Sequence, residues 1–265
     1  MKRSVKVKEV LSALEQFAPL PLQESWDNAG LQVGLTEAEV SGALLCLDVT
    51  EAIIDEAVSK GCNLVVSHHP LLFRGLKTIS DLTDVQRTVR KAIQREVCVV
   101  SMHTNMDNAR GGVNFKIAEK LGLTDVKFLS AKRVGDVECG SGVIGTLEEP
   151  MVSCDFVLKV KQAFDVECAM TNELLRRKVS RVALCGGAGD FLLDEALKAG
   201  ADAFLTGEMH YHQYFGHDGQ IQIGVLGHYQ SEQYTMDIFN QVISEKCPAL
   251  ALFKTTVCTN PIKYL

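Results

Sequence analysis

The sequence predicts an α/β protein built from two similar halves, in which helices flank mixed or parallel sheets. Short apolar runs rich in β-branched residues alternate with amphipathic segments, a pattern typical of βαβ units with parallel strands. The pattern then recurs, because a shift of 139 residues aligns Leu45 with Leu184 and Gly61 with Gly200. A single weak self-match can arise by chance, but two matches in the same order favour an internal duplication.

Composition is that of an ordinary globular protein. The chain has 265 residues, of which 46% are hydrophobic and 23% charged, and its net charge is -6. This length suffices for one large or two moderate domains. The acidic balance, without a visible basic patch, argues against non-specific nucleic-acid binding. It does not exclude a nucleotide or another phosphate-bearing small molecule.

The nine cysteines are scattered and include no C-x-x-C pair. An odd, dispersed set indicates neither a disulfide framework nor a zinc ribbon, and it fits a reducing compartment. The charged N-terminus shows no signal peptide, and no apolar run approaches the roughly 18 residues of a spanning helix. We therefore expect a cytoplasmic protein without a membrane partner.

The elements of the first half follow from hydrophobic periodicity. One apolar face predicts a helix over Val5–Phe17, and Thr50 and Gly61 are typical N-terminal and C-terminal signals of a second helix. Glu24–Gly34 holds the only tryptophan and many turn formers, so we expect a surface loop. The remaining elements are strands at Ala43–Val49, Asn63–Ser67 and Val97–Met102, helices at Glu51–Lys60, Asp84–Arg95 and Val113–Leu121, and a polar loop at Asn105–Gly112.

The second half, taken as residues 126–265 after a first half of 1–125, repeats the strand–helix–strand order. Its later strands match those of the first half, and Glu232 is expected to open a helix that runs through Ile243. No structure is assigned to Lys127–Gly142. The other predicted elements are strands at Val143–Leu147, Val166–Met170 and Val179–Cys185, and a helix at Glu149–Phe164.

The stretch Val65–Pro70 is an apolar strand that ends in two adjacent histidines. Open α/β sheets place ligand sites at the carboxyl ends of their strands, which is where His68 and His69 would lie. Consecutive side chains of a strand diverge, so we expect the two imidazoles to fan apart and to serve two metal ions side by side. The alternative is a pair of capping or core histidines that make hydrogen bonds.

A second set of donors lies after the matching strands. His228 and Glu232 are four residues apart, and on a helix such a pair shares one face and can chelate one ion. Asp107 follows His103 by the same spacing. Alone, each pattern is also explained by a helix cap or an Asx-turn. If the duplication is real, the strand ends line one crevice, and the candidate ligands are His68, His69, Asp107, His228 and Glu232.

These three imidazoles and two carboxylates would leave open positions on two ions, as catalytic metals require. The donor types suit Zn, Fe, Mn, Co or Ni, so we expect two divalent ions per subunit. His103 and Glu232 are the candidate catalytic residues, His103 as a general acid/base or as a support to the ligands.

Other residues near these motifs have weaker signals. Glu208 and His212 would flank the same crevice, whereas His210 and His217 are expected on the surface. Two further features each have two interpretations. Gly186–Gly189 is either a loop whose amides bind an anion or a tight turn. Arg74 and Lys77 either contact phosphate groups or are solvated surface charges.

At these motifs the sequence resembles the NIF-three-like family, whose members are described as GTP cyclohydrolase I type 2 homologues. The resemblance runs nearly from end to end. It rests on Glu24–Gly34 (ESWDNAGLQVG), Ser67–Pro70, Phe73–Lys77, His103–Asp107 with Gly111–Gly112, Cys185–Asp190, Ala201–Glu208, and Gly227–His228 with Glu232.

The resemblance implies two intertwined α/β domains, a toroidal homohexamer and the same five metal ligands. It also implies a hydrolase that attacks the ring of a purine nucleotide through a metal-bound hydroxide, as GTP cyclohydrolase does. The alternative is a non-catalytic ring that stores metal or binds other proteins.

Overall fold

The computed structural model describes residues 4–263. These residues form two compact units: the first comprises residues 4–106 and Thr235–Lys263, and the second comprises Asp107–Tyr234. The chain therefore leaves the first unit and later returns to it. This division differs from the boundary expected after residue 125, because the C-terminal residues complete the first sheet. Within residues 4–263, no helix combines the length and apolar character needed to cross a bilayer.

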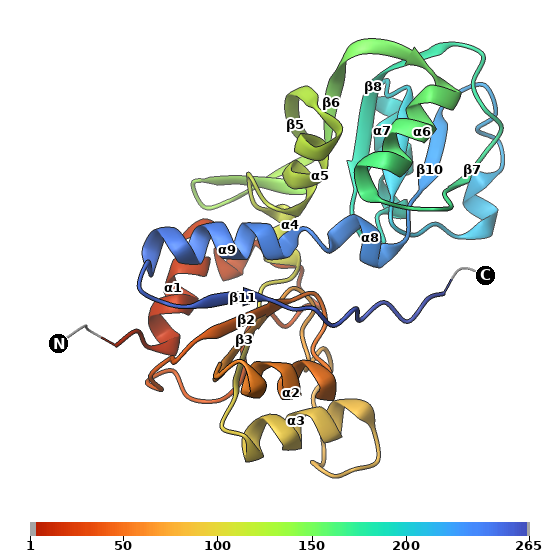
Figure 1. Cartoon of the computed structure of the whole chain (residues 1–265). Coiled ribbons are helices and arrows are strands. Elements are labelled where there is room, and N and C mark those ends of the chain that lie inside the picture. Colours follow the sequence, from red (N-terminus) through yellow and green to blue (C-terminus); the bar gives the residue numbers. More distant parts are fainter. Residues whose placement is uncertain (1–3, 264–265) are drawn as a thin grey trace. The chain divides into compact units, whose positions relative to one another are not determined.

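A five-stranded mixed sheet forms the centre of the first unit, with the order β1-β4-β3-β2-β11. Four strands run parallel, and β1 pairs antiparallel with β4 at the edge. Helices α1 and α9 cover one face of this sheet, and α2 and α3 cover the other (Figure 1). The bounds are β1 Gly30–Val33, β2 Ala43–Cys46, β3 Leu64–Ser67, β4 Cys98–Ser101, β11 Leu252–Lys254, α1 Val7–Phe17, α2 Glu51–Ser59, α3 Asp84–Gln94 and α9 Thr235–Lys246.

Burial on both faces explains the apolar sequence of the central strands. Every residue of β2, β3 and β4 is buried, as expected for parallel strands between two helical layers. Leu44, Val65 and Val99 share the core on the α2 and α3 side. The Thr50 side chain accepts a hydrogen bond from the amide of Ile53, which confirms the predicted N-cap of α2.

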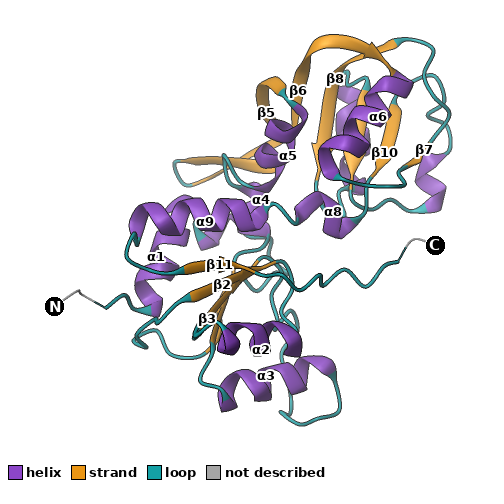
Figure 2. Cartoon of the chain, in the orientation of Figure 1, coloured by secondary structure: helices purple, strands orange, loops and turns teal. Residues whose placement is uncertain are grey.

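The second unit contains a six-stranded mixed sheet with the order β5-β6-β8-β9-β10-β7. Strands β8, β9 and β10 are parallel, and the others join them antiparallel. Helices α5 and α6 pack on one face (Figure 2), and α7 packs on the other. The bounds are β5 Leu123–Val134, β6 Val137–Val152, β7 Met170–Thr171, β8 Lys178–Cys185, β9 Ala203–Thr206, β10 Gln222–Val225, α5 Val113–Leu121, α6 Ser153–Phe164 and α7 Leu193–Lys198.

Strand pairing confirms the predicted duplication. Ala43 pairs with Leu64 in the first sheet, and the shift of 139 residues carries this pair to Val182 and Ala203, which pair in the second. In both units a third parallel strand follows, and a short antiparallel strand borders it. The fold is therefore α/β, with two related mixed sheets that are each flanked by helices.

Several local expectations were wrong. Gly30–Val33 is strand β1 rather than loop, and the loop expected over Asn105–Gly112 begins with a short helix, α4, Thr104–Asn108. The strand expected over Val166–Met170 is reduced to β7. Strand β6 extends through Val152, so α6 begins at Ser153. The helix expected from Glu232 onward is two helices, α8 (His228–Glu232) and α9.

Glu56 ties the C-terminal segment to α2. Its carboxylate accepts hydrogen bonds from the amide and hydroxyl of Thr256, at 2.9 and 2.8 Å, and from the hydroxyl of Thr255. Burial alone raises the pKa of Glu56, but these hydrogen bonds outweigh burial and hold the pKa below its usual range. The ionised carboxylate therefore stabilises the fold.

Replacing Glu56 with Gln should lower the free energy of unfolding at pH 7 by about 1 kcal/mol, because a charged acceptor is lost. The pKa of Glu56 is depressed in the folded state, so this contribution is present at neutral pH. It is lost as the pH falls from the ordinary value of 4.5 through the lower folded value. Denaturant unfolding at a series of pH values measures the difference between wild type and variant. A difference that stays constant down to pH 3, or one matched by the exposed Glu245→Gln, would contradict this role.

Candidate metal centre

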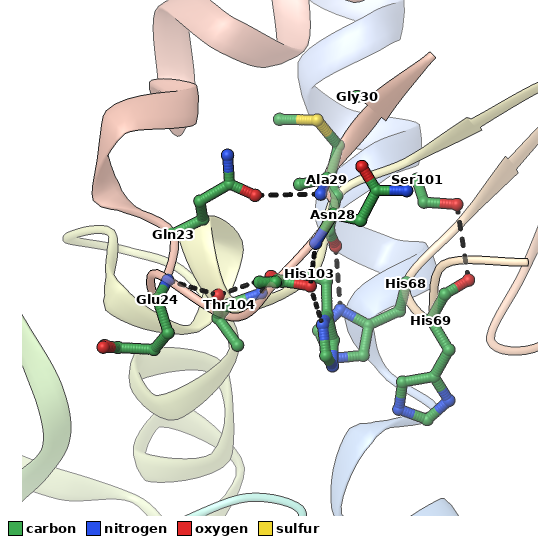
Figure 3. A network of polar contacts seen from close by, with 12 residues as sticks. Gln23, Glu24, Asn28, Ala29, Gly30, His68, His69, Ser101, His103 and Thr104 are labelled. Atoms are coloured by element: carbon green, nitrogen blue, oxygen red, sulfur yellow. Dashed lines mark hydrogen bonds and ion pairs between the residues drawn. The ribbon is translucent and has the colours of Figure 1, made fainter. Parts of the chain in front are cut away.

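Three histidines gather at the carboxyl edge of the first sheet. His68 and His69 follow β3, and His103 follows its parallel neighbour β4. The centroid of the His103 ring lies 5.3 Å from that of His68 and 5.5 Å from that of His69. The centroids of His68 and His69 are 5.0 Å apart (Figure 3). Each ring offers a nitrogen within 4.8 Å of the other two. These positions suit metal ligands, because a shared ion requires converging lone pairs.

The expectation that the rings of His68 and His69 fan apart was wrong. Strand β3 ends at Ser67, and the two histidines lie in a bend, where the alternation of strand side chains no longer applies. The hydroxyl of Ser67 donates a hydrogen bond to the carbonyl of His69 at 2.9 Å, which fixes this bend. The adjacent rings can therefore serve one ion or two neighbouring ions.

Hydrogen bonds at Nδ1 set the orientation of both candidate ligands. His68 Nδ1 lies 2.9 Å from the carbonyl oxygen of Met102, and His69 Nδ1 lies 2.7 Å from Asp48 Oδ1. A carbonyl only accepts, so the His68 proton is on Nδ1 and the lone pair is on Nε2. A carboxylate favours the same tautomer in His69. This is the arrangement in which proteins present Nε2 to a metal.

His103 is held in the same way, by a buried carboxylate. Asp27 Oδ1 lies 2.7 Å from His103 Nδ1, and Asp27 Oδ2 accepts from the amide of Thr104 at 3.0 Å and from its hydroxyl. The side chain of Asp27 is fully buried. Burial raises the pKa of Asp27, but the hydrogen bonds from His103 and Thr104 outweigh it and lower the pKa to about 2. Asp27 is thus a permanent acceptor at neutral pH.

Sequence reasoning missed Asp27 and Asp48. Asp27 lies in the segment that was assigned to a surface loop, and nothing in its local sequence distinguishes it from a turn residue. Asp48 was predictable, because it lies two residues after β2, the strand next to β3, and so belongs to the same edge of the sheet. Its second oxygen accepts a hydrogen bond from the hydroxyl of Thr259 at 2.6 Å. The C-terminal segment therefore helps to hold the carboxylate that orients His69.

The second unit gathers the other candidate donors around Glu232. His228 follows β10 and begins α8, and its Nε2 lies 3.0 Å from Glu232 Oε2. Its Nδ1 lies 2.9 Å from Glu208 Oε1. A carboxylate oxygen of Asp107 lies within 4.8 Å of one from Glu232. The side chain of Glu232 is only 5% exposed.

His228 lies between two carboxylates, which restricts its chemistry. If Nδ1 donates to Glu208, the lone pair on Nε2 faces an oxygen of Glu232, and two acceptors at 3.0 Å repel each other. The contact is stable with a proton between the two atoms, carried by the ring or by the carboxyl group, or with a metal ion that both atoms bind. A divalent ion would also neutralise part of the charge of Asp107.

Gly187 provides the space for this cluster. A Cβ added there would come within 2.3 Å of Glu232 Oε1 and 3.4 Å of His228 Cε1, and the residue has a φ of +59°. The hydroxyl of Ser231 accepts from the amide of Gly187 at 3.0 Å and donates to the carbonyl of His228 at 2.8 Å. The turn at Gly186–Gly189 is therefore a tight βα turn whose missing side chain admits the candidate ligands. The acid-rich donor set and this space both fit a divalent cation.

The remaining candidates have separate environments. Glu208 contacts His228, as described above. His210 is exposed as expected, and its pairing with Asp190 raises its pKa. His212 contacts the rings of Tyr211 and Phe215. Arg74 and Lys77 are exposed.

Comparisons with known proteins agree with this fold. The family model Duf34/NIF3 (NGG1p interacting factor 3) matches residues 5–261. A Clostridium acetobutylicum protein named GTP cyclohydrolase 1 type 2 homolog is 33% identical over 86% of this chain and 86% of its own length. A Campylobacter jejuni protein of the same name is 31% identical over 98% of this chain and 100% of its own.

Solved structures share the fold over the whole chain. A Staphylococcus aureus protein superposes with a TM-score of 0.89 at 25% identity, over 98% of this chain and 99% of its own. A Bacillus cereus protein related to NIF3 has a TM-score of 0.88 at 24% identity, with both chains covered completely. Together, the end-to-end family match and these relatives show that the chain belongs to the Duf34/NIF3 family.

Proposed function

We propose that this protein is a metal-dependent hydrolase of a purine nucleotide ring, with two divalent ions held by His68, His69, Asp107, His228 and Glu232. The names of the relatives support the substrate class, and the donor geometry within each unit supports the metal. The proposal requires that donors from both units serve the same pair of ions. A homohexamer, implied by the sequence resemblance, is part of this proposal.

One observation carries the proposal. All three imidazoles assigned as ligands have Nδ1 next to an oxygen acceptor: His68 next to Met102 O, His69 next to Asp48, and His228 next to Glu208. Core histidines that only fill space have no need for a common tautomer. In the second unit, the Nε2 of His228 beside the buried carboxylate of Glu232 is what a cation site requires.

When bound, divalent ions in such a site act as Lewis acids and lower the pKa of water. The chain itself supplies positioning and proton transfer. His103 lies beside His68 and His69 but depends on Asp27, which keeps its Nδ1 protonated. Its Nε2 can then accept a proton at one stage and return it at another, which is the role of a general acid/base.

Removal of the ligands should abolish both metal binding and turnover. We expect His68→Ala and Glu232→Ala to lose most of the metal that mass spectrometry detects in the wild type, because each variant removes a donor that neighbouring residues orient. Release of product from GTP, other nucleotides or phosphoesters should fall to background in these variants, and in the wild type after chelation. His210→Ala is the matched control, because it removes an exposed imidazole paired with Asp190.

The same experiment separates the hydrolase from the alternative ring scaffold. Full metal content without turnover of any tested substrate would favour the scaffold. Metal content that is unchanged in both ligand variants would rule out the proposed site.

Gly187→Ala should weaken metal binding without altering any ligand. The new Cβ would collide with Glu232 Oε1, so the carboxylate must move from its position beside His228. We expect at least a tenfold loss of metal affinity in a competition titration with a chelator, as for changes that displace ligands. Gly135→Ala is the control, because Gly135 has a φ of +58° and nothing within 4 Å of the added atom. Equal metal affinity in the two variants would show that the space at Gly187 is unrelated to the ligands.

His103→Gln should separate proton transfer from metal binding. We expect metal content to stay at the wild-type level and kcat to fall by roughly 10²- to 10⁴-fold, the usual contribution of a general acid/base. Metal analysis and steady-state kinetics on one preparation make the comparison. A loss of metal in His103→Gln would instead identify His103 as a ligand, which its nitrogen within 4.8 Å of those of His68 and His69 permits.

A further inference from the structure

Two large aromatic side chains lie on the surface beside the histidines of the first unit. Trp26 is 59% exposed and Phe73 is 45% exposed. Their ring centroids are 5.8 Å apart at an angle of 61°, and both contact His103, at 6.2 and 6.3 Å. A folded protein usually buries rings of this size, so their exposure next to a candidate catalytic residue points to a ligand.

The segment that carries Trp26 is fixed to the segment that carries Phe73. Asn28 Nδ2 donates to the carbonyl of Leu72 at 2.6 Å, and the amide of Leu72 donates to Gln32 Oε1 at 3.1 Å. These bonds join Leu72, the residue before Phe73, to the segment that follows Trp26. The relative position of the two rings is therefore set before any ligand arrives, which lowers the entropic cost of binding.

A second set of bonds fixes the same segment to His103. Asp27 follows Trp26 directly and accepts from the His103 ring and from Thr104. The amide of Glu24 donates to the hydroxyl of Thr104 at 2.9 Å. Figure 3 shows Glu24, Asn28 and Thr104 of this network beside His103. One short stretch of chain thus orients His103 and presents an aromatic ring next to it.

We propose that Trp26 and Phe73 form the binding surface for the base of a purine nucleotide, with the edge of the base directed toward His103. This inference rests on the proposed function and deepens it by assigning the residues that recognise the substrate. Aromatic side chains bind bases by stacking, since every base has a π-face, and a neighbouring imidazole can exchange a hydrogen bond or a proton with the edge of the base. The loop of Phe73 also carries the exposed Arg74 and Lys77, which match the negative charge of phosphate groups.

Trp26 is the only tryptophan of the chain, so its fluorescence reports this surface alone. We expect GTP to change the tryptophan emission of the wild type in a saturable way, both in chelated and in metal-loaded protein. Ribose 5-phosphate, which lacks the base, should leave the emission unchanged. Phe73→Leu keeps the fluorophore and should raise the Kd for GTP by about 5- to 100-fold, the range for loss of one stacking partner.

Phe253→Leu is the matched control. Phe253 is a partly exposed phenylalanine of the same unit, but it lies on β11 and contacts Lys60 rather than a histidine. Its replacement should leave the Kd for GTP and the emission of Trp26 unchanged. Trp26→Leu, followed by calorimetry because the fluorophore is lost, should weaken GTP binding as Phe73→Leu does.

The outcomes distinguish this inference from the proposed function. If turnover of a nucleotide is chelator-sensitive, but GTP leaves the Trp26 emission unchanged and Phe73→Leu leaves KM unchanged, the binding surface is wrong and the hydrolase stands. If GTP binds here in chelated protein but no nucleotide is turned over with metal, the hydrolase fails and the binding surface stands. If the Trp26 emission depends on protein concentration and not on GTP, the inference is wrong, and the two rings contact another copy of the chain.

Discussion

The hydrogen bond at Nδ1 of each histidine is the interaction on which the site depends. An imidazole ring can present either nitrogen, and a metal or a substrate requires one of them in a defined direction. In this protein a backbone carbonyl orients His68, and carboxylates orient His69, His103 and His228. Charge-assisted bonds of this kind are stronger than neutral ones, so they restrict the rings even where the surroundings are open to solvent.

The duplicated fold explains how these partners come to lie at the ends of the strands. Corresponding strand ends serve different purposes in the two units. A shift of 139 residues carries Asp48 to Gly187 and His69 to Glu208. In the first unit a carboxylate supports an imidazole. In the second unit a carboxylate at the histidine position supports His228, and the glycine leaves room for Glu232.

The sequence was sufficient to predict the buried parallel strands and the helices that connect them. Strand β3 and its neighbours are short, apolar and bounded by turn signals, and helix α2 has a capping threonine. Strands of mixed exposure were harder. Gly30–Val33 is an edge strand among turn formers, and the hairpin of β5 and β6 was missed although Gly135 and Asp136 form a recognisable turn. The helix expected from Glu149 begins only at Ser153, and Pro150 lies where the pairing of β6 with β8 is irregular.

The candidate site was predictable only in part, for a related reason. The histidines could be found because they follow predictable strands. Asp48 also follows such a strand, although it was missed. Asp27 could not be found, because its burial depends on contacts with Thr104 and His103, far along the chain. Short motifs thus predicted the candidate donors, whereas the groups that orient them required the tertiary structure.

The central proposal is that His68, His69, Asp107, His228 and Glu232 bind the same pair of divalent ions. Anomalous diffraction from crystals of the metal-loaded protein, recorded on both sides of the absorption edge of the metal, tests it most directly. We expect two anomalous peaks, with Nε2 atoms of the three histidines and oxygens of both carboxylates at bonding distance. Peaks bonded to His68 and His69 without His228 and Glu232, or no peak at any of these residues, would contradict the account.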